Sequence, residues 1–85
     1  MKYIIKKHYE ATENNHNYKG EIKDYYEGKA GHIIGNDHFP VAWEIEEYGY
    51  STKAAAIKGL KAAKELAEWE TNHGFWNVTV SLVEA

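Results

Sequence analysis

Residues 51–74 read STKAAAIKGLKAAKELAEWETNHG, and this stretch decides the fold. Apolar residues recur in it at the three- and four-residue spacing of an α-helix, with lysines and glutamates between them. Ser51 or Thr52 is suited to cap the start of such a helix, and Gly74 is suited to end it in the left-handed conformation. We therefore predict one long helix, whose buried stripe runs through three small residues, Ala56, Gly59 and Ala63.

On both sides of this helix the pattern changes to the alternation of half-buried strands. The predicted strands are residues 2–10, 18–27, 40–48 and 75–83. In the third of these, Val41, Trp43 and Ile45 are expected to face inward, and Pro40 suits a strand start. Residues 35–38 are predicted to form a loop, preceded by the short apolar piece at residues 33–34.

The predicted order of elements is strand, strand, strand, helix, strand. Three strands with short connections form an antiparallel meander, and a helix of about 20 residues returns the chain by about 30 Å. A right-handed crossover then places the last strand beside the first, parallel to the third. We predict a single α+β domain of residues 1–85, with a four-stranded, mostly antiparallel sheet in the order 4-1-2-3 and one long helix packed on one face.

The composition excludes several classes of protein. Hydrophobic residues make up 44% of the 85, which is ordinary for one small globular domain. The chain has no cysteine, so disulfides and thiolate zinc sites are excluded. No apolar run approaches the ~18 residues that span a bilayer, and early lysines interrupt any signal-peptide core. We expect a cytoplasmic protein that does not associate with membranes.

The charge balance argues against a nucleic-acid partner. All ten basic residues are lysines, against thirteen acidic ones, so the net charge is −3. Nucleic-acid binders usually carry a basic footprint and use the planar fork of arginine. An AT-rich genome would produce the same lysine-only set, so nucleic-acid binding is kept as the alternative function.

No motif in the chain predicts catalysis, a metal or a cofactor. His32, Asp37 and His38 form the only compact group of nitrogen and carboxylate ligands, and their spacing is not that of a metal site. The only serines, Ser51 and Ser81, fall at a helix cap and on a strand, with no nucleophile elbow around either. We expect a protein that is not an enzyme and needs no cofactor.

Aromatic residues are the first unusual feature, since the chain holds seven tyrosines and three tryptophans. Tyr25 and Tyr48 are predicted on the outer face of the sheet and Tyr50 at the entry to the helix. Glu44 and Glu46 are expected beside them. Tyrosine and tryptophan dominate binding hot spots, so this set predicts a protein-binding surface. Cross-strand aromatic packing is the alternative interpretation.

The charge order of the helix is the second unusual feature. Lysines fill its first two thirds and glutamates its last part, which is the reverse of what the helix dipole favours. Pairs four residues apart, such as Lys61 with Glu65 and Lys64 with Glu68, are the ordinary interpretation of this pattern.

The start of the helix is a candidate anion site. Free backbone N–H groups, the hydroxyls of Ser51 and Thr52 and the ammonium of Lys53 would converge there. A phosphate-bearing small ligand or a carboxylate of a partner would suit this position. The competing interpretation is a plain helix cap beside a solvated lysine.

Residues 48–59 read YGYSTKAAAIKG and resemble the strand-to-helix entry of the small modules at the N-termini of phage-type integrases. They are also similar to short bacterial proteins of unknown function. The integrase resemblance implies three strands followed by a helix, with DNA bound on the sheet. This chain lacks the usual basic sheet of those modules, so no functional residue is transferred from them.

The leading hypothesis is a small non-catalytic module that binds another protein. Phage or mobile-element proteins of this size and charge can occupy and inhibit a host protein such as a nuclease, and this part of the hypothesis is an analogy. The alternatives are nucleic-acid binding through the sheet face or the lysine-rich helix, and a small phosphate-bearing ligand at the helix start.

Overall fold

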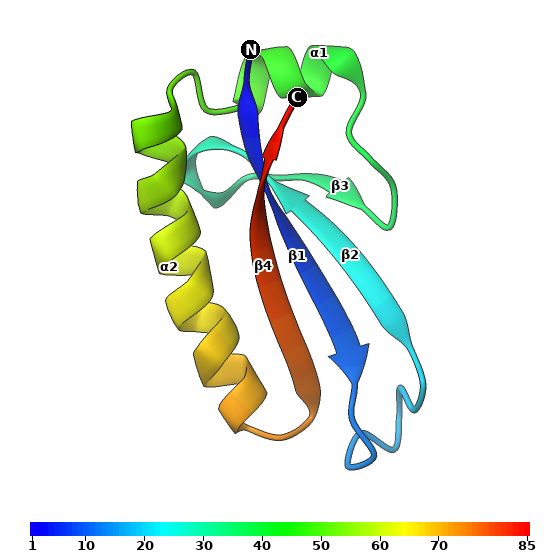
Figure 1. The fold of residues 1–85 in the computed structure, drawn as a ribbon. Coiled ribbons are helices and arrows are strands. Elements are labelled where there is room, and N and C mark those ends of the chain that lie inside the picture. Colours follow the sequence, from blue (N-terminus) through cyan, green and yellow to red (C-terminus); the bar gives the residue numbers. More distant parts are fainter.

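The computed structural model describes all 85 residues as one four-stranded antiparallel sheet with one long and one short helix (Figure 1). The strands are β1 (Tyr3–Ala11), β2 (Ile22–Glu27), β3 (Ile33–Asn36) and β4 (Trp76–Glu84), in the order β3-β2-β1-β4. The helices are α1 (Ala42–Tyr48), α2 (Lys53–Asn72) and a 3-10 turn, η1 (Lys29–Gly31). The predicted α+β class and strand order are confirmed.

The long helix is also confirmed, with Thr52 as its cap. The Thr52 hydroxyl accepts a hydrogen bond from the Ala55 N–H at 3.2 Å, and Gly74 follows the helix with φ +86°. Of the predicted buried stripe, Ala56 and Ala63 are buried and Gly59 is half-buried, while Ala67 is buried as well. The short side chains of these alanines let the backbone come close to β4 and β1. No helix in the structure combines the length and the apolar character needed to cross a membrane.

Both faces of the sheet are covered at the end where the two termini lie. Ile4 and Ile5 are successive residues of β1, so their side chains point to opposite faces, and both are fully buried. Ile4 packs with Tyr26 and Ile34 on the face that α1 covers through Tyr48. Ile5 lies on the α2 face, next to Gly59.

The outer edge of β4 is joined to α2. Lys2 and Ala85 form a hydrogen-bonded pair, in which each N–H donates to the carbonyl of the other residue. In an antiparallel ladder every second residue is paired in this way, so the odd-numbered residues of β4 bond to β1. The N–H and C=O groups of Val78 therefore point away from β1. The Thr71 hydroxyl, near the end of α2, accepts a hydrogen bond from the Val78 N–H at 3.0 Å. The last turn of α2 therefore satisfies part of the free edge of β4.

The predicted third strand, residues 40–48, was wrong, because this segment contains helix α1. The Val41 N–H donates to the Glu44 carboxylate at 3.2 Å, the contact that a glutamate makes three residues into a helix. Ile45 and Tyr48 turn inward at helical spacing, whereas Trp43 is 63% exposed. The actual third strand is β3, which combines the apolar piece at residues 33–34 with the first two residues of the predicted loop.

The predicted direction of the last strand was also wrong. β4 is antiparallel to β1, so the whole sheet is antiparallel. The reason is the loop after β3 together with α1, which carries the chain back to the end where the termini lie (Figure 1). α2 then runs away from that end and β4 returns to it.

Gly59 gives a test of this packing. A Cβ atom at Gly59 would clash with the Tyr50 hydroxyl and lie 3.1 Å from Cδ1 of Ile5. We expect Gly59→Leu to lower the free energy of unfolding by ~1–3 kcal/mol through overpacking. Lys61→Ala, on the exposed side of α2, is the control and is expected to change it little. Equal small effects in denaturant titrations would contradict the observed orientation of α2.

Candidate functional site

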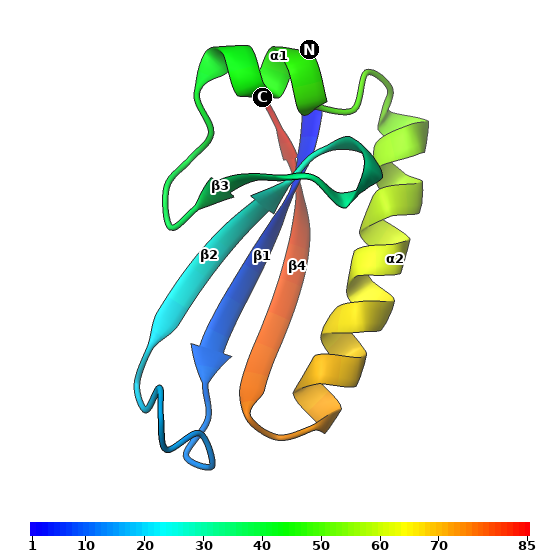
Figure 2. The ribbon, with the colours of Figure 1, turned by 180° about the vertical axis from the view of Figure 1, so that it is seen from behind.

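One helix covers only part of the sheet face on which it packs. α2 lies against β4 and, to a lesser extent, β1. Seen from behind, no other element covers the lower parts of β1 and β2 on this face (Figure 2). A cavity of about 370 Å³ lies here, lined by Lys7, Tyr9, Lys23, Tyr25, Ile33, Glu70 and Trp76.

A second cavity, of about 190 Å³, shares Lys7 with the first and continues between α2 and η1. Its other lining residues are Glu27, Gly31, Tyr50, Gly59, Ala62, Ala63 and Leu66. We call the two cavities together the α2 groove. Its walls are α2 on one side and β2 with η1 on the other, and its floor is β1.

Three aromatic side chains from three strands form the centre of the larger cavity. Strand alternation and register put Tyr9, Tyr25 and Trp76 on the same face of β1, β2 and β4. The Tyr9 ring meets the Tyr25 ring edge-on at 5.3 Å and the Trp76 ring edge-on at 5.8 Å. Tyr18 packs on the far side of Trp76 at 5.7 Å. Edge-to-face contacts of this kind hold the rings in fixed positions.

Each lysine of the groove is paired with a carboxylate. Lys7 Nζ lies 2.8 Å from Glu27, and their side chains are only 11% and 14% exposed. Lys23 Nζ lies 3.4 Å from Glu21 and 4.9 Å from the centre of the Tyr18 ring. The groove therefore has aromatic and aliphatic walls and little net positive charge.

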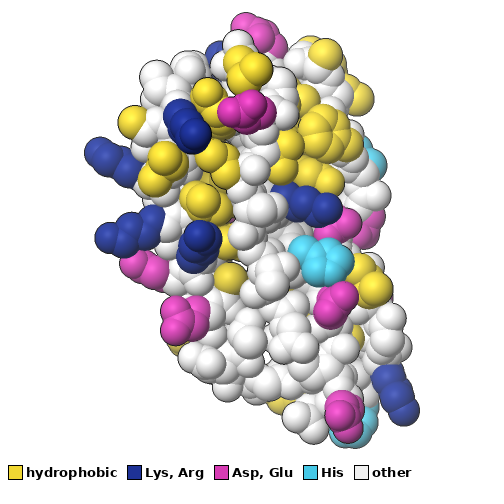
Figure 3. Space-filling model, viewed as in Figure 1, with side chains coloured by type: hydrophobic (Ala, Val, Ile, Leu, Met, Phe, Trp, Pro, Cys, Tyr) yellow, Lys and Arg dark blue, Asp and Glu magenta, His cyan; other side chains and the backbone are white.

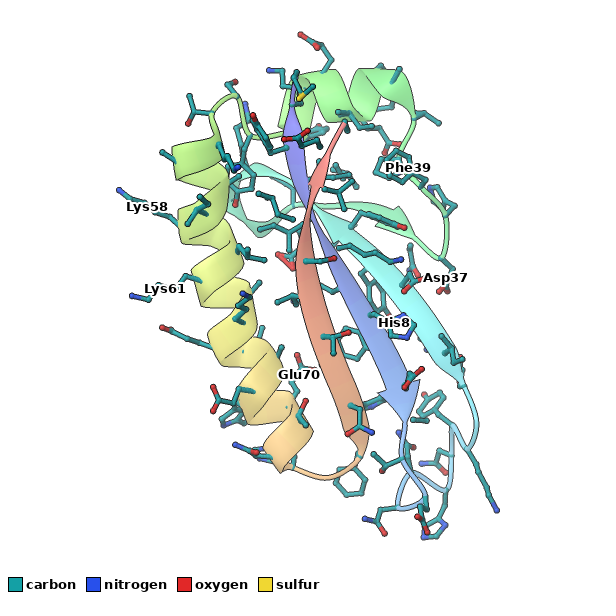
Figure 4. The ribbon with its side chains drawn as sticks, viewed as in Figure 1. His8, Asp37, Phe39, Lys58, Lys61 and Glu70 are labelled. Carbon is teal, nitrogen blue, oxygen red and sulfur yellow. The ribbon has the colours of Figure 1, made fainter.

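Two tyrosines of the groove, Tyr9 and Tyr50, have a raised pKa. The Tyr9 hydroxyl donates to the Glu70 carboxylate at 2.8 Å, and Glu70 points from α2 toward the sheet (Figure 4). Burial, followed by this hydrogen bond, raises the pKa of Tyr9 well above its ordinary value. Burial and the nearby charge of Glu27 raise the pKa of Tyr50 as well. These phenols are hydrogen-bond donors at neutral pH.

The five residues predicted for protein binding do not come together on one surface. Tyr25 lines the larger cavity and Tyr50 the smaller one. Glu44, Glu46 and Tyr48 belong to α1 and not to a sheet face. Tyr48 packs against the Ile4 cluster, and Glu44 bonds to the start of its own helix.

The residues predicted for anion binding are adjacent, but their hydroxyls already have partners. Thr52 caps α2, and the Ser51 hydroxyl accepts from Lys2 Nζ at 3.1 Å. Lys53 is exposed. Nothing else at this helix start points to a ligand, so the anion site stays a prediction.

The histidine-containing loop does not gather its ligand-type side chains. His32 packs on the Tyr48 ring at 5.1 Å, and His38 Nδ1 lies 2.9 Å from the Asn36 carbonyl. The Asp37 carboxylate accepts from the Asp24 N–H at 3.0 Å. No group of three or more histidine, aspartate or glutamate side chains in the structure is arranged to hold a metal ion.

Sequence reasoning missed most of the groove, including Tyr9, Trp76 and Lys7. Their common face could be read from strand alternation. The sequence also indicated that part of the sheet would stay uncovered. One helix is about 10 Å wide, and a sheet of four strands spaced about 4.8 Å apart is wider than that. Which part of the sheet α2 would leave open was not predictable, since this depends on the packing of three alanines.

Comparison of the chain with protein-family models, curated proteins and solved structures finds no match. The comparisons add no support to the resemblance of residues 48–59 to integrase modules. The function is therefore inferred from the chemistry of the α2 groove.

A polar cluster occupies the opposite face of the sheet. His8 Nδ1 lies 2.6 Å from the Asp24 carboxylate on β2, and Nε2 lies 3.3 Å from Glu10 (Figure 4). The hydrogen bonds with Asp24 and then Glu10 raise the pKa of His8 above its ordinary value of 6.5. Protonated His8 therefore links β1 to β2.

This cluster predicts a pH dependence of stability. Because the folded-state pKa of His8 is raised, its stabilising effect is complete below pH 6.5 and is lost as the pH rises through the folded-state pKa. We expect the free energy of unfolding to decline over that interval and the decline to be weaker in Asp24→Asn. Urea titrations at a series of pH values, with NMR titration of the His8 ring, measure both. An unchanged pH dependence in the variant would contradict the assignment.

Proposed function

We propose that this chain is a non-catalytic protein-binding domain, and that the α2 groove receives an apolar segment of another protein. The observation that carries the proposal is the open half of the α2 face, where aromatic rings line a cavity of about 370 Å³. A cytoplasmic module that inhibits a host protein is the narrower form of the proposal. That form rests on the small size, the acidic charge and the absence of cysteine.

The surface has the character of a binding hot spot. Tyr9, Tyr25 and Trp76 offer large ring area with few rotatable bonds, and tyrosine and tryptophan are enriched where partners bind. Ile33 adds an aliphatic side chain that is 61% exposed at the rim. Burying these side chains against an apolar partner would gain roughly 25 cal/mol per Å² of apolar surface removed from water.

The charges of the groove favour a protein over a nucleic acid. Aromatic rings and lysines together could stack bases and neutralise phosphates. Here, however, Lys7 is paired with Glu27 and Lys23 with Glu21, so neither is free to replace a counterion. A protein segment needs no such release.

The charged walls specify the chemistry of the occupant. Glu70 stands on the α2 wall and Lys23 on the β2 wall of the same cavity. A complementary segment would carry apolar side chains toward the rings and a basic residue toward Glu70, whereas Lys23 already has Glu21 as its partner.

Two isoleucines of nearly equal exposure test the groove. Ile33 is 61% exposed and lines it, whereas Ile22 is 60% exposed and pairs with Glu10 across the other face. Peptides that bind the wild-type domain can be selected from a displayed random library on the immobilised protein. We expect these peptides to bind Ile33→Asp at least ten-fold more weakly, a loss of about 1.4 kcal/mol in binding free energy. Ile22→Asp is expected to bind as the wild type does.

Tyr25→Ala provides a second variant within the groove, and it should weaken the same peptides. Labelled DNA and RNA, titrated at two salt concentrations, test the alternative function, and we expect no binding at either. Peptides that bind Ile33→Asp and Tyr25→Ala as tightly as the wild type would overturn the proposal. Salt-dependent nucleic-acid binding lost in Lys23→Ala would replace it.

A further inference from the structure

The charged side chains of α2 form no ion pair within the chain, and only Glu70 has a hydrogen-bond partner elsewhere in it, the Tyr9 hydroxyl. Its lysines are Lys53, Lys58, Lys61 and Lys64, and its glutamates are Glu65, Glu68 and Glu70. None of these lysines lies within 4 Å of a carboxylate, so the predicted pairs four residues apart are not formed. The order of charges also opposes the helix dipole, so no interaction within the chain explains it.

One exposed stripe of α2 carries part of this charge pattern together with a large apolar side chain. It contains Ala55, Lys58, Ala62, Glu65 and Trp69, spaced by three and four residues, and all five are exposed. The Trp69 side chain is 59% exposed and touches the His73 ring at 4.0 Å. Lys58 and Lys61 stand away from the sheet (Figure 4), and Figure 3 shows lysines and hydrophobic side chains side by side over α2.

The stripe is complementary to itself about Ala62. Ala55 lies seven residues before Ala62 and Trp69 lies seven residues after it. At equal distances from Ala62 the stripe therefore has a small side chain toward its N-terminal end and a large one toward its C-terminal end. Lys58 and Glu65 lie four residues before and three after it, so a positive charge corresponds to a negative one. A two-fold axis through such a stripe brings each side chain to its complement.

We propose that α2 pairs antiparallel with α2 of a second copy of this chain, with the two-fold axis at Ala62. Trp69 then covers Ala55 of the second copy, and Lys58 faces Glu65 of the second copy. The lysine-rich half of each helix meets the glutamate-rich half of the other, which accounts for the charge order. The two helix dipoles also oppose each other favourably.

The size of the contact sets the expected strength. Alanine at the centre allows the helix axes to approach to the lower part of the usual 8–10 Å range. The contact from Ala55 to Trp69 spans fourteen residue steps, or about 21 Å of helix. An interface of this length is small, so the dimer is expected to form reversibly as concentration rises.

Charge reversal within the stripe tests the pairing in the full chain. Sedimentation velocity of the wild type, from micromolar to millimolar concentration, should show a monomer converting to a dimer. Lys58→Glu and Glu65→Lys should each keep the protein monomeric over that range, because like charges then meet twice across the two-fold axis. The double variant K58E/E65K restores opposite charges and should dimerise as the wild type does.

Lys64→Glu is the matched control, since Lys64 lies on the other flank of α2, beside Val78 and Val80 of β4. It makes the same charge change and should leave the monomer–dimer equilibrium unaltered, and far-UV circular dichroism verifies that each variant is folded. Ile33→Asp should also leave this equilibrium unaltered, which separates the dimer from peptide binding in the larger cavity, since of the stripe only Ala62 lines the α2 groove, in its smaller cavity. A wild type that stays monomeric, or single reversals that behave like Lys64→Glu, would overturn the proposal.

Discussion

The close approach of α2 to two strands is the constraint on which the rest of the structure depends. Ala56, Ala63 and Ala67 are the buried residues of this helix, and none reaches beyond Cβ. With such short side chains the backbone can sit low over β4 and β1, and the helix cannot also extend over β2 and β3.

Because α2 leaves part of the sheet uncovered, side chains of the strands themselves must stabilise that part. Tyr9, Tyr25 and Trp76 fill that face with rings that brace one another in place of an overlying helix. Charged side chains that are largely buried on this face form an ion pair, as Lys7 does with Glu27 at 2.8 Å. An ion pair so little exposed would be costly to break, because the remaining charge would be buried without a partner.

The elements predicted correctly are those with one dominant pattern. α2 combines helical periodicity with a cap and a glycine stop, and β4 alternates from Trp76 to Leu82. α1 was missed because Val41, Trp43 and Ile45 fit an alternating strand equally well. The hydrogen bond from the Val41 N–H to the Glu44 carboxylate is typical of a helix start and favours the helix. β3 was missed because four residues are too few to show a period.

The residues of the candidate groove were harder to predict than the fold, for a related reason. Sequence pattern indicates which residues share a face, and it put Tyr25 among the candidates. It does not indicate where across that face the helix packs, and this position determines which strand residues are covered and which stay exposed. Glu44 and Glu46 then failed as neighbours of Tyr25 because their strand was a helix.

The hydrogen bond between Thr71 and Val78 has a consequence for the behaviour of this protein in concentrated solution. β4 is a nine-residue edge strand with no charge between Trp76 and Val83, the kind of edge that templates aggregation. The end of α2 occupies one of its outward N–H groups, and the opposite edge of the sheet, β3, is only four residues long. Resistance to fibril formation should therefore depend on the last turn of α2, and fraying of that turn is the first step by which the fold would become prone to aggregate.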